Sequence, residues 1–587
     1  MLPGTARPAW RRPLRVVPLV LLALVGALGP AGPARPAPTP DVGSAQALAA
    51  ASDWPQLHHG PDRTGFQPGE TRVTTTTVPH LREVRRYLTG SGGNLPPLLA
   101  DGVLYTVGTG RLQAFDATGR VGCAGVPVVC SPLWSVPSTF FQALTVGAGR
   151  VVATGSTGVY VYDATACRTS PASCRPLWTT STHTTTGPAF VAGGGSPLVS
   201  GTTLYVPGYG QSQALAAGGA YVAAFDLLGT SGCSGTPVVC APIWTTTGPG
   251  GIWVNNGSPA VVGNRLYLAS DALFAFAADG TTRCAGAPRV CRPTSTGVLP
   301  TAIDSSAVSA PAVSGGRVFV PLGNGPLAAF DAAGSLGCST VGGVNTCRPL
   351  WTSTLQSGRG TPAVAGGRVY VVRGGRSVLQ AYDAAGVAGC SGAAGARTCA
   401  PVWGSSDNPS SFFLSSRSPV VGGGVVYAVA DDGSVSAYDA QGRRHCATSG
   451  GSRVCSPIWS ALTGFAPGDA VEVSNGVVIV NLSQVGYLLA YGLPPASPTG
   501  VTASPGAKGS LDVHLTPGDG NGSPVASTTA TCMSVTGARG TGTKAGSVAV
   551  VTVTGLTSGA RYTCTATQKN PAGASTSSSP SASVVAP

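Results

Sequence analysis

The sequence predicts an all-β protein, an eight-bladed β-propeller of four-stranded antiparallel blades followed by a smaller second β-domain. Its 587 residues include 85 glycines and 49 prolines but only 10% charged residues, which favours short strands and tight turns over amphipathic helices. A hydrophobic content of 43% is enough for a large packed core. A unit of roughly fifty residues with four β-rich runs recurs along the chain, and such a period is typical of propeller blades.

Residues 1–37 have the pattern of a signal peptide. Arginines precede an apolar run from Val16 to Gly29, and small residues follow it. The run is shorter than the roughly 20 residues of a comfortable membrane span, although an uncleaved N-terminal anchor stays open. We therefore expect a secreted or cell-envelope protein in which residues 38–80 form a lead-in segment.

Sixteen cysteines in an exported chain are expected to be oxidised. Fourteen of them form close pairs, one in each of seven repeats, and this spacing predicts disulfides between neighbours. A zinc site is rejected because the spacing is not Cys-x2-Cys and no histidine recurs with the pairs. Each closed loop of roughly eight to ten residues contributes about 2.5 kcal/mol in the chain-entropy model. The pairs are Cys123 with Cys130, Cys167 with Cys174, Cys233 with Cys240, Cys284 with Cys291, Cys338 with Cys347, Cys390 with Cys399, and Cys446 with Cys455.

The repeated unit is typified by "APAVSGGRVFVPLGNGPLAAFDAAG", which starts at Ala310. Its three β-rich runs are separated by glycine turns, and the segment after the cysteines supplies the fourth strand. The cysteine loop therefore lies between the third and fourth strands. The eighth unit has neither cysteines nor a fourth strand, while "LREVRRYLTG" at 81–90 is a spare strand. We expect the strand near 84–88 to complete the last blade, so that the propeller comprises residues 81–494 and has no open edge.

Two motifs carry a resemblance to a known family. "AFDATG" followed by "PLW", together with "DWPQLHHGPDRTGF" at 53–66, resembles the tryptophan-docking repeat of pyrroloquinoline-quinone-type propellers, over roughly residues 53–494. The resemblance implies that a tryptophan on each outer strand packs against the next blade. The fourth unit has "CRPTS" where the tryptophan should stand, so its contact is expected to be weaker. The docking residues are Trp134, Trp178, Trp244, Trp351, Trp403 and Trp459.

A Pro-rich linker at 495–500 introduces the second domain. Residues 501–587 resemble a fibronectin type III domain, with Tyr562 as its corner tyrosine and Leu515 in place of the usual core tryptophan. The resemblance places Cys532 and Cys564 on neighbouring strands, where they can form the eighth disulfide.

No catalytic residue, metal or cofactor is predicted. The quinoprotein dehydrogenases that the propeller resembles carry a vicinal Cys-Cys disulfide and a calcium ion, whereas this sequence has no adjacent cysteines. Binding of a quinone or of calcium stays an open alternative, although no motif supports it. His58 and His59 are interpreted as a solvated turn. Hydrolase motifs are also missing. The nominal calcium ligands are Asn256, Asp304 and Glu472, and the nominal acids for glycoside cleavage are Asp304, Asp431, Asp432 and Glu472.

A binding surface is predicted on the loops that connect each outer strand to the next blade. These loops carry aromatics beside amides and hydroxyls, as in "GGIWVNNG" at 250–257. Trp253, Asn255 and Asn256 are the candidate ligand-facing residues, and the alternative is that the aromatics fill gaps between inner strands.

The predicted function is that of a monomeric, non-catalytic binding or scaffold protein with a protein or glycan partner at the cell surface. The alternatives are an extracellular enzyme, either a quinone-dependent dehydrogenase or a polysaccharide hydrolase, and an envelope assembly factor. A nucleic-acid partner is not expected, because the net charge of +13 comes partly from the first fifteen residues and the other arginines form no stripe.

Overall fold

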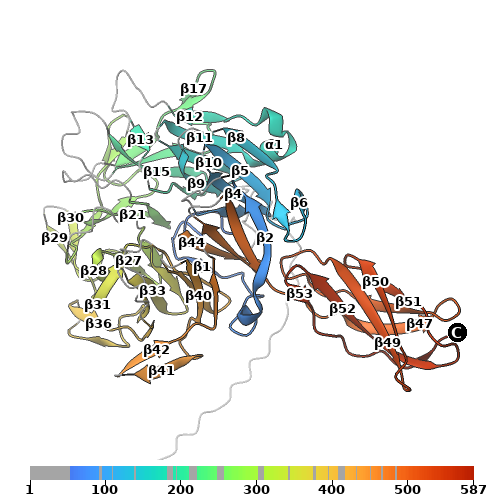
Figure 1. The fold of residues 1–587 in the computed structure, drawn as a ribbon. Coiled ribbons are helices and arrows are strands. Elements are labelled where there is room, and N and C mark those ends of the chain that lie inside the picture. The colour runs from blue at the N-terminus through green and yellow to red at the C-terminus, as the bar shows by residue number, and fades with distance from the viewer. Residues whose placement is uncertain are drawn as a thin grey trace, which may run out of the picture. The chain divides into compact units, whose positions relative to one another are not determined.

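The computed structural model describes residues 53–587 except 91–95, 109, 138–140, 156, 181–189, 193–194, 211–220, 247–256, 288, 302–309, 342–343, 374–377, 394, 407–416, 431–432, 450, 464–466 and 483–485. The described chain is almost entirely β, which confirms the predicted all-β, propeller-like fold (Figure 1). The helices among these residues are α1 (Ala164–Thr169) and the 3-10 turns η1 (Val78–His80) and η2 (Pro171–Ser173). None of them is long and apolar enough to cross a membrane.

Eight sheets are built from residues 66–492 of the described chain, each around four antiparallel strands that we number first to fourth from the inner edge outward. The sheets are, in order, β3 (Leu98–Ala100), β4 (Val103–Gly108), β5 (Arg111–Asp116) and β8 (Trp134–Pro137); β9 (Phe141–Gly147), β10 (Arg150–Gly155), β11 (Gly158–Asp163) and β12 (Trp178–Thr180); β14 (Leu198–Ser200), β15 (Thr203–Gly210), β16 (Tyr221–Asp226) and β19 (Trp244–Thr246), with β13 (Phe190–Ala192) beside β15; β20 (Ala260–Val262), β21 (Arg265–Ala269), β22 (Leu273–Ala277) and β25 (Ser295–Gly297); β26 (Ala312–Ser314), β27 (Arg317–Pro321), β28 (Gly323–Asp331) and β31 (Trp351–Gly358); β32 (Ala363–Ala365), β33 (Arg368–Arg373), β34 (Val378–Asp383) and β37 (Trp403–Ser405); β38 (Val420–Gly422), β39 (Val425–Val429), β40 (Ser434–Asp439) and β43 (Trp459–Leu462), with β1 (Phe66–Gln67) beside β38; and β44 (Pro467–Ser474), β45 (Val477–Leu482), β46 (Tyr487–Gly492) and β2 (Arg82–Leu88).

An aspartate at the end of the third strand organises the turn that follows it. The Asp383 carboxylate accepts the backbone N–H groups of Val387 at 2.9 Å and Ala388 at 2.8 Å. Burial raises the pKa of this carboxyl, but the backbone donors together outweigh burial and lower the pKa below its ordinary value. The same arrangement recurs at Asp116, Asp226, Asp331 and Asp439.

The tryptophan of a fourth strand packs on a glycine of the next repeat. A Cβ atom at Gly229, where φ is +74°, would lie 2.9 Å from Cδ1 of Trp178. Only glycine therefore allows the indole to approach this closely. In the fourth sheet Ser295 stands at this position and lies beside Gly334, so the contact is smaller there. Equivalent contacts join Trp244 to Gly280, Trp351 to Gly386 and Trp403 to Gly442.

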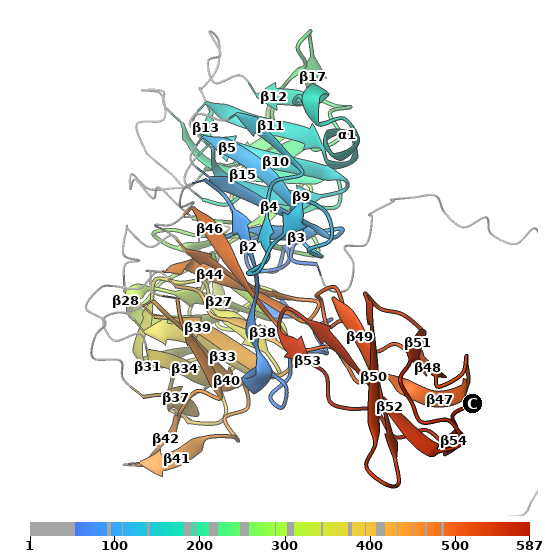
Figure 2. The same ribbon diagram turned by 45° about the vertical axis from the view of Figure 1, so that its right-hand side comes forward.

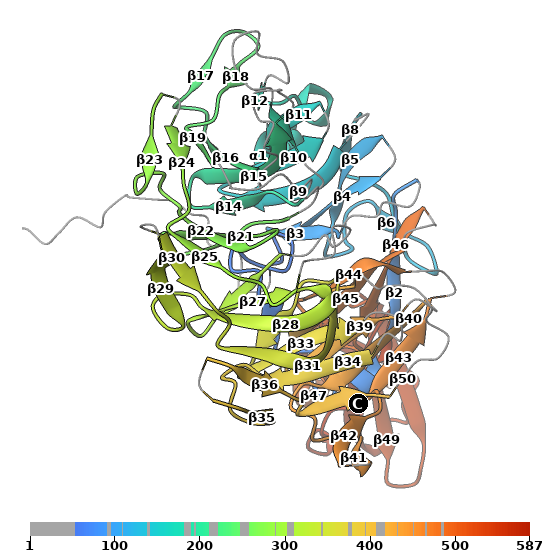
Figure 3. The same cartoon turned by 90° about the vertical axis from the view of Figure 1, so that its left-hand side faces the viewer.

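The cysteine loops do more than close on themselves. All eight predicted disulfides are present. Six of the loops are two-stranded hairpins that extend the sheet of the preceding repeat, because one hairpin strand pairs in parallel with the fourth strand of that sheet (Figure 3). These pairings place β6 (Cys123–Ala124) and β7 (Val129–Cys130) on β2, β17 (Cys233–Ser234) and β18 (Val239–Cys240) on β12, β23 (Cys284–Ala285) and β24 (Arg289–Cys291) on β19, β29 (Cys338–Val341) and β30 (Val344–Cys347) on β25, β35 (Cys390–Ser391) and β36 (Arg397–Cys399) on β31, and β41 (Cys446–Ser449) and β42 (Ser452–Cys455) on β37.

The loop between Cys167 and Cys174 is the exception. It forms α1 and η2 instead of a hairpin, and the Asp163 carboxylate caps α1 by accepting the backbone N–H of Ala166 at 2.8 Å. The two cysteines pack in one buried cluster with Trp134 of the first sheet. A helical loop therefore covers the outer side of the first sheet, where the other repeats use a hairpin.

The strand β2 joins the last sheet, as Figure 2 shows beside β46. It pairs antiparallel with β46 and parallel with β7, so residues from both ends of the repeat array form one sheet. Arg85 takes the place of the docking tryptophan in this sheet, opposite Ala490. Its guanidinium packs on Gly119 of the first repeat, where an added Cβ would lie 2.6 Å from Nη1.

The C-terminal residues form two further sheets around one buried cluster. The Cys532–Cys564 disulfide joins residues directly opposite each other on two strands of one sheet. The buried Tyr562 hydroxyl accepts the backbone N–H of Thr557 at 3.0 Å, which fixes the preceding corner. The first sheet contains β47 (Thr499–Pro505), β48 (Leu511–Thr516) and β51 (Val550–Val553), and the second contains β50 (Arg539–Ala545), β49 (Ser527–Ser534), β52 (Arg561–Asn570), β53 (Gly573–Ala574) and β54 (Val584–Val585).

Candidate functional site

The segment from Asp53 to Glu70 contacts all eight repeats in chain order. Each contact is a hydrogen bond between this segment and the first strand of a repeat or the turn after it, so this short stretch lies along the inner edges of all the sheets. In order of the repeats, the bonds are Trp54 N–H to Leu99 O (2.7 Å), Val146 N–H to Pro55 O (2.9 Å), Val199 N–H to Gln56 Oε1 (2.9 Å), Val261 N–H to Pro61 O (2.7 Å), Val313 N–H to Asp62 O (2.9 Å), Val364 N–H to Thr64 O (2.8 Å), Val421 N–H to Gly65 O (2.8 Å) and Gly476 N–H to Glu70 Oε2 (2.9 Å).

Arg63 is the centre of this segment and is 0% exposed. Its guanidinium donates to four backbone carbonyls, and desolvation lowers the pKa of Arg63 to about 9 although the Asp62 charge raises it. Carbonyl dipoles from several elements thus stabilise the buried cation. The acceptors are Leu57 O (2.7 Å), Pro259 O (3.0 Å), Pro197 O (3.0 Å) and Ser196 O (3.4 Å).

The interpretation of His58 and His59 as a solvated turn is wrong for His58. Its ring is 2% exposed and packs against Gly65, whose positive φ leaves the space that a side chain would fill. Burial lowers the pKa of His58 to about 3, so the ring is neutral, and its Nδ1 lies 3.2 Å from the Arg63 carbonyl oxygen. This histidine is a structural part of the segment, in a tight turn where both histidines adopt positive φ.

A cavity of about 460 Å³ lies where the eighth sheet, the first repeat and the C-terminal domain meet. Arg72 closes one side of it through an ion pair with Asp519 at 2.7 Å. The lining residues are Asp53, Arg72, Leu99, Asp101, Gly102, Ala117, Thr118, Arg120, Ser474, Asn475, Val477, Ile479, Asp519, Gly520, Gly522, Ser523 and Pro524.

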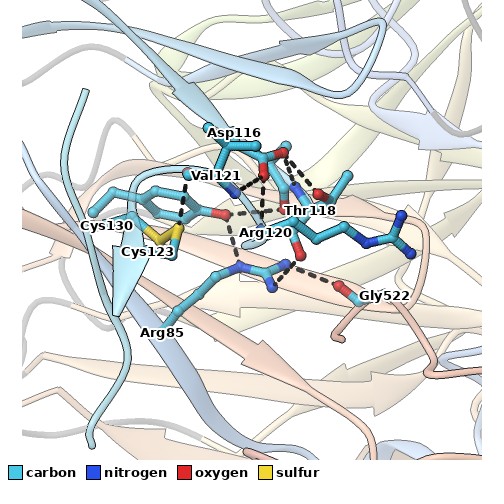
Figure 4. The surroundings of a disulfide bond; sticks show 10 residues. Arg85, Asp116, Thr118, Arg120, Val121, Cys123, Cys130 and Gly522 are labelled. Carbon is cyan, nitrogen blue, oxygen red and sulfur yellow. Dashed lines mark hydrogen bonds between the residues drawn. A yellow bond between two sulfur atoms is a disulfide. The ribbon is translucent and has the colours of Figure 1, made fainter. Parts of the chain in front are cut away.

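Arg85 connects the same three parts of the chain (Figure 4). Its guanidinium donates to Thr118 O at 3.1 Å and Gly522 O at 3.0 Å, and its Nε donates to the Tyr87 hydroxyl at 2.8 Å. An indole at this position would pack on Gly119 but could not supply these three bonds. The exchange of tryptophan for arginine therefore ties the last sheet to the C-terminal domain.

Glu472 is the one nominal site residue that the structure describes. Its side chain is 1% exposed, and its two carboxylate oxygens have no hydrogen-bond partner among the described residues. Since side chains alternate along β44, Glu472 lies on the same face as Ser474, which lines the cavity. Burial raises the pKa of Glu472 well above its ordinary value, so burial favours the protonated form of this carboxyl.

Replacing Glu472 with glutamine should stabilise the protein at neutral pH and leave it nearly unchanged in mild acid. The unfolded carboxyl ionises near its ordinary pKa of 4.5, whereas the folded one stays protonated to a much higher pH. The folded state therefore holds the extra proton, and wild-type stability falls as pH rises, by up to about 1.4 kcal/mol per pH unit. Urea unfolding of both proteins between about pH 4 and 8 measures this slope. A difference that does not change with pH would contradict the buried carboxyl.

The other predicted site residues lie outside the described part of the chain. This holds for the ligand-facing candidates Trp253, Asn255 and Asn256 and for the nominal acids Asp304, Asp431 and Asp432. Among the described residues, no group of three or more His, Cys, Asp or Glu side chains is placed to hold a metal ion. Sequence reasoning missed Arg63 and Arg85. Aligning "REVRRYL" with the outer strands, which places Arg85 where the docking tryptophan stands, would have indicated the second of them.

Comparison with known proteins gives a partial match. Residues 343–445 match the family described as outer membrane protein assembly factor BamB. No curated protein matches the sequence. Among solved structures, the chain is similar to the quinohemoprotein alcohol dehydrogenase from Comamonas testosteroni, with 11% identity over 75% of this chain and 80% of that chain at a TM-score of 0.49. It is also similar to BamB from Moraxella catarrhalis, with 14% identity over 70% of this chain and 99% of that chain at a TM-score of 0.45.

A third similarity is shorter. The chicken CNTN1 FN1–FN3 structure matches 16% of this chain and 33% of its own length, with 18% identity and a TM-score of 0.15. Neither an activity nor a partner follows from similarities at these levels.

Proposed function

We propose that this protein is an exported, non-catalytic binding scaffold for a protein or glycan partner. Its eight sheets would form one ring closed by β2, and its C-terminal domain would be a spacer of the fibronectin type III kind. Eight disulfides indicate an oxidising environment, which fits an extracellular or envelope location. The observation that carries the proposal is the path of residues 53–70 along the inner edges of all eight repeats.

The path of this segment also supports a choice of the face that binds the partner. Asp53 accepts the backbone N–H of Asp101 at 2.9 Å and Glu70 accepts that of Gly476, and both donors lie in turns between a first and a second strand. The segment therefore lies at the end of the sheets that carries these turns. The connections from each fourth strand to the next first strand leave from the opposite end. Those connections are the aromatic-rich loops that the sequence singles out, including the one with Trp253.

The sixteen cysteines also bear on the choice between binding and dehydrogenase chemistry. All of them form disulfides between residues at least seven positions apart. A vicinal disulfide of the quinoprotein kind would therefore require a different cysteine arrangement. This supports a binding role over a quinone-dependent one.

The proposal is tested by replacing Trp253 with alanine. The variant and the wild-type protein are screened on a glycan array and by cross-linking to cell-surface proteins. We expect the partner signal to fall at least about tenfold, as for loss of an aromatic anchor, with little change in Tm. The matched control is Trp403→Ala, which should lower Tm by cavity formation without removing the partner signal at moderate temperature. A quinone absorbance band with dehydrogenase activity in the purified protein would overturn the proposal, as would unaltered binding by the Trp253 variant.

A further inference from the structure

The outer edge of the seventh sheet differs from the outer edges of the other sheets. Six sheets carry a hairpin strand from the following repeat on their fourth strand, and the first sheet is covered by the helical loop around α1. The eighth repeat has no cysteine loop to donate to β43. Among the described residues, no strand pairs with the outer side of β43.

The six sheet edges that carry a hairpin strand show what kind of strand an outer edge binds. The donated strand runs parallel to the fourth strand, with Arg289 opposite Trp244 and Arg397 opposite Trp351. Backbone bonds join the strands, as from Thr179 N–H to Val238 O at 3.1 Å. In four of the six donated strands, an arginine or asparagine also donates to the carbonyl of a glycine in its own repeat, and this glycine is the docking glycine in three of those four. These bonds are Arg397 to Gly386 (2.9 Å), Arg453 to Gly442 (2.6 Å), Asn345 to Gly334 (3.2 Å) and Arg289 to Gly280 (3.4 Å).

The side of β43 that pairs with β40 has the same hydrogen-bond pattern as the fourth strands of the other sheets. Ile458 N–H donates to Ala437 O at 2.8 Å, just as Val402 N–H donates to Ala381 O at 2.8 Å in the sixth sheet. Ser460 lies opposite Ser436, as Thr179 lies opposite Tyr160 in the second sheet. By this equivalence, the N–H of Ser460 is the outward donor that a parallel strand would use.

The outer side of β43 is open and partly apolar. The Leu462 side chain is 75% exposed, whereas Trp244, Trp351 and Trp403 of the covered strands are nearly fully buried. Trp459 is only partly buried, and it contacts Tyr491 with ring centroids 5.3 Å apart. An exposed edge with unpaired backbone groups and apolar side chains is a template for an added strand.

We propose that the outer edge of β43 binds an extended segment of another protein, added as a parallel strand in the register that the cysteine hairpins use elsewhere in this chain. The segment has arginine, asparagine or valine opposite Trp459, followed by a β-branched residue, as in the six hairpins. The partner is another protein and not a second copy, because the six strand hairpins of each copy are occupied in their own sheets and the seventh cysteine loop is helical. This surface is separate from the loop face of the proposed function.

The chain supplies both the probe and its control. The probe is the disulfide-closed peptide 231–242, whose strands β17 and β18 lie on a Trp-Thr-Thr strand in the second sheet. The control is the disulfide-closed peptide 165–176, which has the same cysteine separation of 7 but adopts the helical form. Calorimetry measures binding to the full chain, and hydrogen exchange locates it. We expect peptide 231–242 to bind and to protect the amides of residues 459–462, and peptide 165–176 to do neither.

Two variants test the site itself. Leu462→Lys places a charge on the exposed edge, and Ser460→Pro removes its donor. Each should weaken the binding of peptide 231–242 by about tenfold. The matched control Leu336→Lys changes another exposed leucine and should leave binding unchanged. Three results would overturn the proposal: neither peptide protects β43, both peptides bind equally, or β43 is already protected in the full chain by residues 1–52 or by a second copy.

Discussion

Replacing Arg63 with methionine should lower the free energy of unfolding by about 3–5 kcal/mol. Methionine has a similar length but no donor, so the variant leaves the backbone carbonyls that now receive the guanidinium without a partner in a fully buried place. Three of these carbonyls belong to residues 196, 197 and 259 of two different repeats, so the loss spreads beyond the opening segment. Guanidinium unfolding followed by tryptophan fluorescence measures the effect.

The control for this substitution is Arg443→Met. Arg443 is exposed, and among the described contacts only its backbone N–H is used, by Asp439. This variant should unfold within about 0.5 kcal/mol of the wild type. Equal stability of the two variants would show that Arg63 does not organise the inner edges of the repeats.

A chain that begins at Ser91 should fail to unfold cooperatively, whereas one that begins at Asp53 should behave like the full chain. The first truncation removes the inner segment that bonds to all eight repeats, and it also removes β2. Without β2, both β46 and β7 would lose the strand that pairs with one of their edges. Scanning calorimetry and near-UV circular dichroism measure this loss of cooperative unfolding.

An intermediate chain that begins at Arg72 separates the two contributions. It keeps β2 but lacks the segment from Asp53 to Glu70, so a lower Tm with a cooperative transition is expected. If the chain from Ser91 melts at the wild-type temperature, closure of the last sheet by β2 does not stabilise the ring, and that part of the proposal fails.

Much of the architecture was predictable because it repeats. The alternation of short apolar runs with glycine turns predicted the strands, and the close spacing of the cysteines predicted their pairing. The spare strand near residues 84–88 was found because the last repeat lacked a fourth run. These features depend on neighbouring residues in the sequence, so local reasoning was sufficient for them.

The destinations of the cysteine hairpins were not predictable in the same way. Whether a hairpin adds to its own sheet or to the preceding one depends on the twist between sheets, which local sequence does not encode. The helical loop did leave a signal. Among the four loops whose cysteines are seven positions apart, the three hairpins, which begin at Cys123, Cys233 and Cys284, have a glycine with positive φ two positions later, whereas the loop from Cys167 has Thr169 there. A β-branched residue disfavours that turn.

The candidate site depends more than the fold on contacts between residues far apart in the sequence. Its ligand-facing residues were chosen because they are aromatic or amide side chains on loops. Such chemistry alone does not tell which side chains lie close together in the fold. Glu472 was singled out because acids are rare in this chain, and its burial became visible only when β44 was placed beside its neighbours. Arg85 looked like one of several arginines in "LREVRRYL" until its register against Ala490 was known.

The donated hairpins also bear on how such a chain can lengthen in evolution. The repeat in the sequence is offset from the sheet that it builds, because six of the eight sheets contain two strands that belong to the following repeat. A tandem duplication within the third to sixth repeats would therefore create a new boundary between repeats. At this boundary, as at the existing ones, a repeat would add its hairpin to the sheet of the repeat before it. The two sheets without a hairpin from the following repeat are the first and the seventh, which are the neighbours of the eighth sheet in repeat order. Whole repeats can thus be gained or lost in the interior of the array, while the two ends that meet at β2 remain fixed.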